Sequence, residues 1–255
     1  MAGTVSGSQE LPAVHLLGTG MAAIVQAIPL PARATGRQVI LVGGLEVLCR
    51  LSRPYRSTTD LDTVSRLQQG QTGQLQLLVA AGATLSGPSG VQLPTALGPV
   101  QIDVLQVADG DFDPLPDDPT DRLHVLSHAW AAETATLMTL LADSPPPVDV
   151  LVAQPAALIA TKLQSAMNRA AAKEGTDFLN IVRLTTDPIT NRPVADGLQS
   201  AGQQLKDDAL LHVARWFEQG RDRTLKRIRS IPEGATTTHD DLELVAELLT
   251  TALTR

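Results

Sequence analysis

The amino-acid sequence predicts an α/β (α+β) domain with a mixed sheet, followed by a helical C-terminal domain. Up to about residue 153, short β-branched apolar runs alternate with helical patterns, whereas from residue 156 onward the apolar spacing is helical. A Ser-Pro-Pro-Pro break at 144–147 lies between the two regions. We therefore expect one domain over 1–150, including an N-terminal helix, and a helical domain over 151–255.

The elements of both domains follow from local composition. Strands are expected where four to eight apolar or β-branched residues occur together, at 38–42, 58–64, 100–107 and 148–153. Helices of the first domain are expected at 12–28, 45–51, 70–83 and in the later part of 122–141. Six aspartates and three prolines predict a solvated loop at 109–121. Helices of the second domain are expected at 156–172, 176–185, 200–229 with an interruption, and 239–254.

Composition limits the kinds of partner. The net charge of -7 argues against a chain that wraps nucleic acid by charge alone, and 2% aromatic residues argue against a base-stacking surface. Cys49 is the sole cysteine, so an internal disulfide and a cysteine zinc cluster are excluded and a reducing cytoplasm fits. Residues 11–32 carry no formal charge, but their prolines, glycines and polar residues suit a membrane span poorly. We expect a cytoplasmic protein without a membrane partner.

Three aspartates carry the chemistry that the sequence predicts. Asp60 and Asp62 are two residues apart in an expected strand, so both carboxylates lie on one face. Asp103 lies between Ile102 and Val104 in another expected strand. Neighbouring carboxylates are costly unless a cation neutralises them, and Mg²⁺ takes oxygen ligands and bridges to phosphates. We predict that the three aspartates bind Mg²⁺, with Mn²⁺ as an alternative, and that two ions would activate a hydroxyl and stabilise pyrophosphate.

A pair of glycines and several cations predict a nucleotide beside that metal. Gly43 and Gly44 end one expected strand and precede a helix, whose free N–H groups favour a phosphate. On one continuous helix, Lys162, Arg169 and Lys173 would share a face and hold a triphosphate, the alternative being a solvated face. Arg56 could contact phosphate or pair with a carboxylate. Glu46 is expected to be a surface residue.

A basic run follows near the C-terminus, and it has two interpretations. It could contact an RNA backbone, or it could be a solvated helix face paired with nearby acids. Its members are Arg221, Arg223, Lys226, Arg227 and Arg229.

Four motifs resemble the AbiEii/AbiGii nucleotidyltransferase toxins of the DNA-polymerase-β-like superfamily. They are Val42-Gly-Gly-Leu-Glu-Val-Leu48, Arg56-Ser-Thr-Thr-Asp-Leu-Asp62, Leu158-Ile-Ala-Thr-Lys-Leu163, and Arg169 with Lys173-Glu-Gly-Thr-Asp177. The resemblance implies a nucleotidyltransferase fold with Gly43 and Gly44 at the nucleotide phosphates. It assigns Asp60 and Asp62 to metal, and Lys162 and Asp177 to the active site across the cleft. The chain departs from the pattern at Gly44, where many relatives have Ser, and at Glu174, where Asp is usual.

The resemblance also implies a function. Members act as toxins beside an antitoxin or in phage defence, and some transfer NMP from an NTP to the 3′ end of tRNA, which would block translation. Two alternatives stay open. The acceptor could be a small molecule or a protein hydroxyl, or the fold could be a degenerate, non-enzymatic binding protein.

Overall fold

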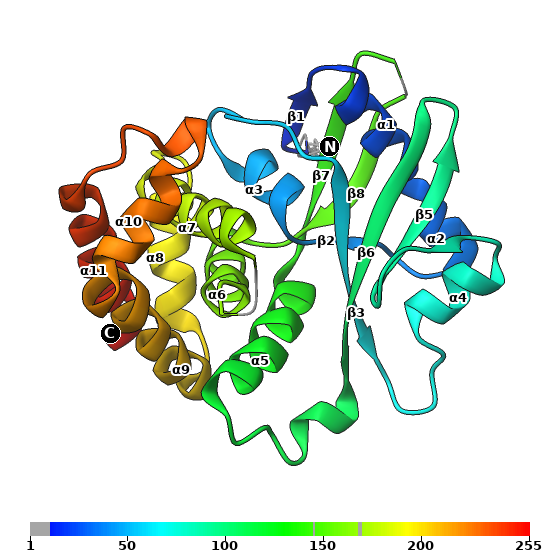
Figure 1. Cartoon of the computed structure of the whole chain (residues 1–255). Helices are drawn as coiled ribbons and strands as arrows, with labels where there is room; N and C mark the ends of the chain where they lie inside the picture. Colours follow the sequence, from blue (N-terminus) through cyan, green and yellow to red (C-terminus); the bar gives the residue numbers. More distant parts are fainter. Residues whose placement is uncertain (1–10, 145, 168–169) are drawn as a thin grey trace, which may run out of the picture.

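The computed structural model describes residues 11–144, 146–167 and 170–255, and it confirms a mixed sheet followed by a helical region (Figure 1). Eight strands form one sheet in the order β1-β7-β8-β2-β3-β6-β5-β4. The pairs β1/β7, β2/β8 and β3/β6 are parallel, and the other neighbours are antiparallel. The strands are β1 (Ala13–Leu16), β2 (Ile40–Leu41), β3 (Asp60–Leu67), β4 (Thr84–Leu85), β5 (Gly90–Thr95), β6 (Gly98–Ala108), β7 (Thr136–Ala142) and β8 (Val148–Val152).

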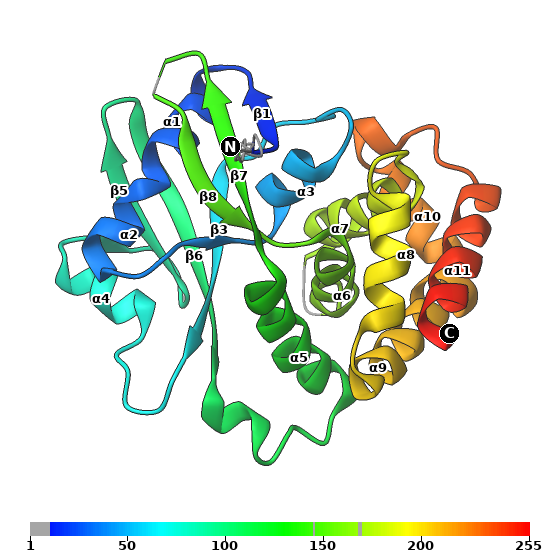
Figure 2. The ribbon, with the colours of Figure 1, turned by 180° about the vertical axis from the view of Figure 1, so that it is seen from behind.

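Helices cover the two faces of this sheet. α1 packs against β5, β6 and β7, while α5 packs against β3 and β6 (Figure 2). Along β3, Leu61 joins the core with α1, whereas Val64 joins the core shared with the helical region. The helices before residue 150 are α1 (Thr19–Ala27), α2 (Pro29–Thr35), α3 (Gly44–Arg50), α4 (Gln74–Ala80) and α5 (Pro119–Thr134).

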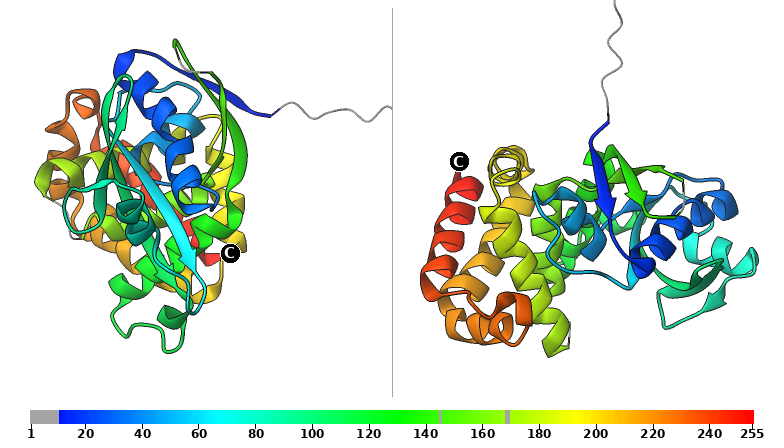
Figure 3. Two further views of the ribbon diagram at one scale, coloured as in Figure 1. Left: turned by 90° about the vertical axis from the view of Figure 1, so that its right-hand side faces the viewer. Right: turned by 90° about the horizontal axis from the view of Figure 1, so that it is seen from above.

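The C-terminal region is helical, as the sequence predicts, and it lies beside the sheet rather than on top of it (Figure 3, right). Its described helices are α6 (Pro155–Ser165), α7 (Ala171–Thr186), α8 (Asn191–Ser200), α9 (Gln203–Val213), α10 (Arg221–Arg229) and α11 (His239–Thr254), with a π-helical turn at Ala214–Gln219. α5 packs against α6 and α9, so one apolar core continues from the sheet into this region. The proposed division at residue 150 stays a prediction.

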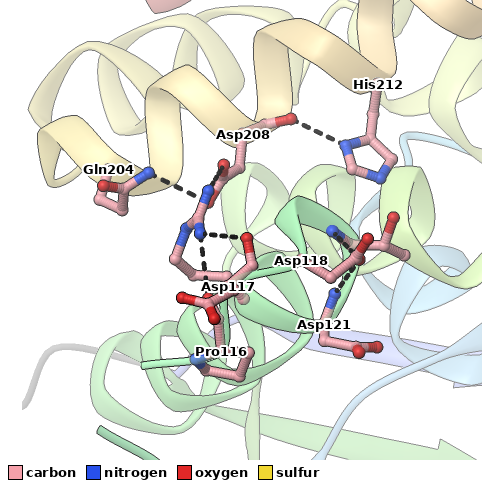
Figure 4. Close-up of polar contacts among 9 residues, drawn as sticks. Pro116, Asp117, Asp118, Asp121, Gln204, Asp208 and His212 are labelled. Atoms are coloured by element: carbon pink, nitrogen blue, oxygen red, sulfur yellow. Dashed lines mark hydrogen bonds and ion pairs between the residues drawn. The ribbon is translucent and has the colours of Figure 1, made fainter. Parts of the chain in front are cut away.

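A partly buried ion pair fastens α5 to α9. The Arg122 guanidinium donates two hydrogen bonds to the Asp208 carboxylate, at 2.8 and 2.7 Å, and two more to the carbonyls of Pro116 and Asp117 (Figure 4). The Asp208 side chain is 1% exposed. The segment before α5 is therefore tied to the helical region by a charged, multidentate contact.

Two of the helices predicted before residue 150 are wrong. Residues 12–28 do not form one helix, because Ala13–Leu16 pairs as β1 with β7 and Gly18 turns the chain, at φ 94°, into α1. The later part of 122–141 is not helical either, because Thr136–Ala142 is the strand between β1 and β8. Short apolar runs fit both strand and helix, and pairing partners distant in sequence decide between them.

The structure also contains helices and strands that the sequence patterns did not predict, among them α2, β4, β5 and α8. In α8, Pro193 lies in the first turn, where its missing N–H costs no helical hydrogen bond. Across the described parts of the chain, no helix has the length and apolar character needed to span a membrane.

Candidate metal centre

The structure brings together the three aspartates. Asp60 and Asp62 lie on β3 and Asp103 lies on β6, and these two strands are parallel with Asp62 opposite Asp103. One carboxylate oxygen from each residue lies within 4.8 Å of the others. Leu61 points to the opposite side, into the core with α1, which is the alternation expected of a strand. All three carboxylates are half-buried at one side of the sheet.

Neutral donors hold two of these carboxylates. The Thr58 hydroxyl donates to Asp60 Oδ1 at 2.7 Å, and the Gln101 amide donates to Asp103 Oδ1 at 2.8 Å. In each case the donor stands two residues before its aspartate. The exposed cation Lys173 is close to the first of them, with its Nζ 3.9 Å from Asp60 Oδ2.

Gly43 makes room for Asp62. Its φ of 106° is a left-handed conformation that favours glycine, and it directly precedes α3. A Cβ at Gly43 would overlap Asp62 Oδ2 and would lie 2.6 Å from the Asp62 Cγ. A Cβ at Gly44 would lie 2.8 Å from Arg56 Nη2. Both glycines therefore lie against groups of the predicted site.

A pocket of about 220 Å³ opens beside the aspartates. α7 contributes one polar stripe to it, at spacings of three and four residues: Lys173, Thr176, Asp177 and Asn180. The other lining residues are Gly44, Arg56, Ser57, Thr58, Thr59, Asp60, Asp62 and Lys162.

Lys162 and Asp177 form a buried ion pair on the wall of this pocket. Lys162 Nζ lies 3.1 Å from Asp177 Oδ1, and the Ser165 hydroxyl donates to Asp177 Oδ2 at 2.9 Å. The two charged side chains are 5% and 3% exposed. Both charged groups therefore line the pocket, and their charges are largely balanced by each other.

The predicted cationic stripe on one continuous helix is wrong, although two of its residues line the pocket. α6 ends at Ser165 and α7 begins at Ala171, so Lys162 and Lys173 belong to different helices. Ala170 has the extended ψ of 151°, in a segment without the proline or glycine that would mark a break. Arg169 lies outside the described residues.

The prediction that Glu46 is a surface residue is also wrong. Glu46 is 0% exposed, because α3 lies between β3 on one side and α6 and α7 on the other. Among the residues that the structure describes, neither carboxylate oxygen has a hydrogen-bond partner. Burial, and after it the nearby charge of Asp62, raises the pKa of Glu46 well above its ordinary value. A fully buried acid therefore lies next to the candidate metal centre.

Sequence reasoning missed Asn180, which lines this pocket, and Tyr55, which binds to it. Asn180 is 1% exposed, and its Oδ1 accepts a hydrogen bond from the Tyr55 hydroxyl at 2.5 Å. Its Nδ2 has no hydrogen-bond partner within the described parts of the chain. Tyr55 packs between the guanidinium groups of Arg56 and Arg183, at 5.9 and 5.3 Å from its ring centre. The helical stripe of α7 was the available signal for Asn180, since it stands three residues after Asp177.

Much of the basic run on α10 is engaged within the molecule. Arg223 and Arg227 both pair with Glu174, whose side chain is 2% exposed, at 2.7 and 3.0 Å. Arg221 pairs with Glu243, and Arg229 donates to the carbonyl of Thr237. Glu174 thus fastens α10 to α7, which accounts for a buried acid at this position.

The donor set fits a hard divalent cation. Three carboxylates that approach within 4.8 Å repel one another, and a divalent ion with oxygen ligands relieves that repulsion. Asp60, Asp62 and Asp103 would hold it. Mg²⁺ and Mn²⁺ both accept an all-oxygen set of this kind.

Comparison with solved structures shows a distant likeness, whereas comparison with protein families and curated proteins does not. None of the protein-family models matches this chain, and no curated protein matches it. The fold is similar to the crystal structure of an antigenic nucleotidyltransferase-like protein from Paracoccidioides brasiliensis. The TM-score is 0.43 and the identity 16%, over 83% of this chain and 92% of that chain. A likeness this distant carries no argument about what this chain binds or does.

Proposed function

We propose that this protein is a divalent-metal-dependent nucleotidyltransferase. The observation that carries the proposal is the acidic cluster of Asp60, Asp62 and Asp103 beside a pocket that also holds cationic side chains. The transfer joins an acceptor hydroxyl oxygen to the α-phosphorus of an NTP and breaks the bond from that phosphorus to the bridging oxygen. Pyrophosphate leaves, and the hydroxyl proton is released.

The residues of the pocket have separate parts in this reaction. Lys162 is held by the buried Asp177, so among the described lining residues Arg56 and Lys173, whose contact with Asp60 is solvent-exposed, would bind phosphate oxygens. The absence of side chains at Gly43 and Gly44 leaves room for Asp62 and Arg56, which in this proposal bind the metal and a phosphate. Bound Mg²⁺ would supply charge for the developing pyrophosphate. Such transfers depend mainly on positioning and electrostatic stabilisation, which fixed carboxylates and cations provide.

The size of the pocket supports binding of the phosphates rather than of the whole nucleotide. Its volume of about 220 Å³ lies below the ~300 Å³ at which pockets begin to enclose a drug-sized ligand. Its described lining is polar and charged. We infer that the triphosphate end enters the pocket and that the ribose and base extend outside it.

The acceptor and the biological role are finer proposals, and they rest on the four motifs that resemble AbiEii/AbiGii toxins. On that resemblance, the acceptor is the 3′ end of tRNA, a cognate antitoxin opposes the enzyme, and the protein acts in the cytoplasm. The alternative acceptor is a small-molecule or protein hydroxyl. Because α10 uses Arg223 and Arg227 to hold Glu174, that helix offers few uncommitted cations to RNA.

Transfer of label from an α-³²P NTP tests the proposal. We expect Mg²⁺-dependent labelling of one acceptor among tRNA, total protein and small hydroxyl compounds, incubated in parallel. Asp60→Asn should abolish the labelling, whereas Asp196→Asn, in an exposed ion pair on α8, should leave it unchanged. Equal labelling by wild type and Asp60→Asn would refute the metal role. Failure of calorimetry to detect Mg-NTP binding would favour a non-enzymatic protein.

A further inference from the structure

Gln101 contacts the candidate metal centre, but no motif points to it. It stands two residues before Asp103 on β6, so both side chains lie on the same face of the strand. Gln101 Nε2 donates to Asp103 Oδ1 at 2.8 Å and to the carbonyl of Ser86 at 3.3 Å. The same amide nitrogen therefore donates to the backbone and to the carboxylate, so the Ser86 carbonyl helps to hold it against Asp103.

The neighbouring strand leaves space for this contact. Gly90 on β5 is directly opposite Asp103 in the antiparallel register. A Cβ at Gly90 would overlap Gln101 Nε2 and would lie 2.5 Å from Asp103 Oδ1 and 2.7 Å from the Ser86 carbonyl oxygen. The φ of Gly90 is not in the left-handed region, so its backbone does not require glycine. What requires glycine is the space that the amide and the carboxylate occupy.

We propose that Gln101 is a positioning residue for Asp103, and that Gly90 makes that positioning possible. The amide fixes the rotation of the Asp103 carboxylate, so that its other oxygen faces the divalent cation. This inference rests on the proposed function, because it assumes that Asp103 is a metal ligand. Thr58 has the same relation to Asp60, from the same position two residues earlier.

A neutral donor suits this position. A Lys or Arg would orient the carboxylate but would also add a positive charge that competes with the cation. An amide N–H donates without adding charge, so the negative charge of the cluster stays available to the metal. Partners that orient metal ligands in this way typically change metal affinity by about 10- to 100-fold when they are removed.

Mn²⁺ binding measured by electron paramagnetic resonance tests the proposal without relying on catalysis. Free Mn²⁺ gives a strong signal that is lost on binding, so titration yields the affinity of the site. We expect Gln101→Met to weaken Mn²⁺ binding about 10- to 100-fold. We also expect it to raise the Mn²⁺ concentration needed for half-maximal labelling, while labelling at saturating Mn²⁺ stays near the wild-type level.

The matched control is Gln106→Met on the same strand. Gln106 accepts a hydrogen bond from the Gln74 backbone N–H at 2.8 Å, away from the aspartates, so its loss should cost stability but not Mn²⁺ affinity. Wild-type Mn²⁺ binding by Gln101→Met, or equal weakening by both variants, would overturn the proposal. Should Gln101→Met fail to fold, Gly90→Ala replaces it, with the same expected loss and the same contrary result.

Asp103→Asn separates this inference from the proposed function. If Asp103→Asn binds Mn²⁺ like wild type, the prediction that Asp103 is a metal ligand is wrong, and the proposed function loses its support. If Asp103→Asn loses Mn²⁺ while Gln101→Met and Gly90→Ala keep it, only the positioning role is wrong.

Discussion

Replacing Gly43 by Ala should disable the candidate metal centre through one steric contact. The added Cβ would lie 2.6 Å from Asp62 Cγ, and an ordinary separation of 3.4 Å requires the carboxylate to move by about 0.8 Å. Misplacement of a reacting group by about 1 Å can cost about 10²-fold in rate. We therefore expect labelling by Gly43→Ala to fall about 100-fold.

The same substitution should also lower stability. Alanine at a φ of 106° is strained by about 1–3 kcal/mol. For a chain of this size, that strain lowers the melting temperature by about 2–12 °C. The assay pairs thermal unfolding with α-³²P NTP transfer at temperatures where the variant is fully folded.

Gly82→Ala is the matched control for backbone strain. Gly82 has a φ of 97°, close to that of Gly43, but a Cβ there meets nothing within 4 Å. It should lose a similar amount of stability and keep its activity. The reasoning is refuted if Gly43→Ala transfers label like wild type when folded, or if Gly82→Ala loses as much activity.

Two other predictions concern stability. Arg122→Ala leaves the buried Asp208 carboxylate without its main partner, which should cost about 1–3 kcal/mol because the partly exposed site admits some water. Urea denaturation should show this loss in the free energy of unfolding. Arg192→Ala, in an exposed pair, should cost at most about 0.5 kcal/mol. Equal losses in the two variants would contradict a stabilising role for the Arg122–Asp208 pair. Burial raises the pKa of Glu46, so folding favours its protonated form. The free energy of unfolding is therefore highest at pH values below the ordinary pKa of a carboxyl group, and it falls as the pH rises through the raised pKa. Glu46→Met, which removes two unpartnered buried oxygens, should therefore raise the melting temperature in EDTA by about 2–12 °C at pH 8 and by less at pH 5. A larger gain at pH 5 would show that the acid is not desolvated.

Local sequence patterns determined the elements that carry the site. Alternation along β3 places Asp60 and Asp62 on one side and Leu61 in the core. Gly43-Gly44 marks the start of α3, and the Ile102-Asp-Val104 run marks β6. These are short-range properties, because the periodicity of a strand and the conformational freedom of glycine depend on neighbours in sequence.

Only the tertiary structure decided which of these elements meet. The parallel register that sets Asp62 opposite Asp103 is a pairing across 40 residues, and no local pattern encodes it. The burial of Glu46 arises because α6 and α7 close over α3, although a charged helical residue is usually exposed. Lys162 and Lys173 reach one pocket from two helices, which a single helical wheel cannot represent. The sequence by itself thus determined which side chains are suited to bind a metal and phosphate, while long-range packing decided their distances, their burial and the supporting contacts of Gln101.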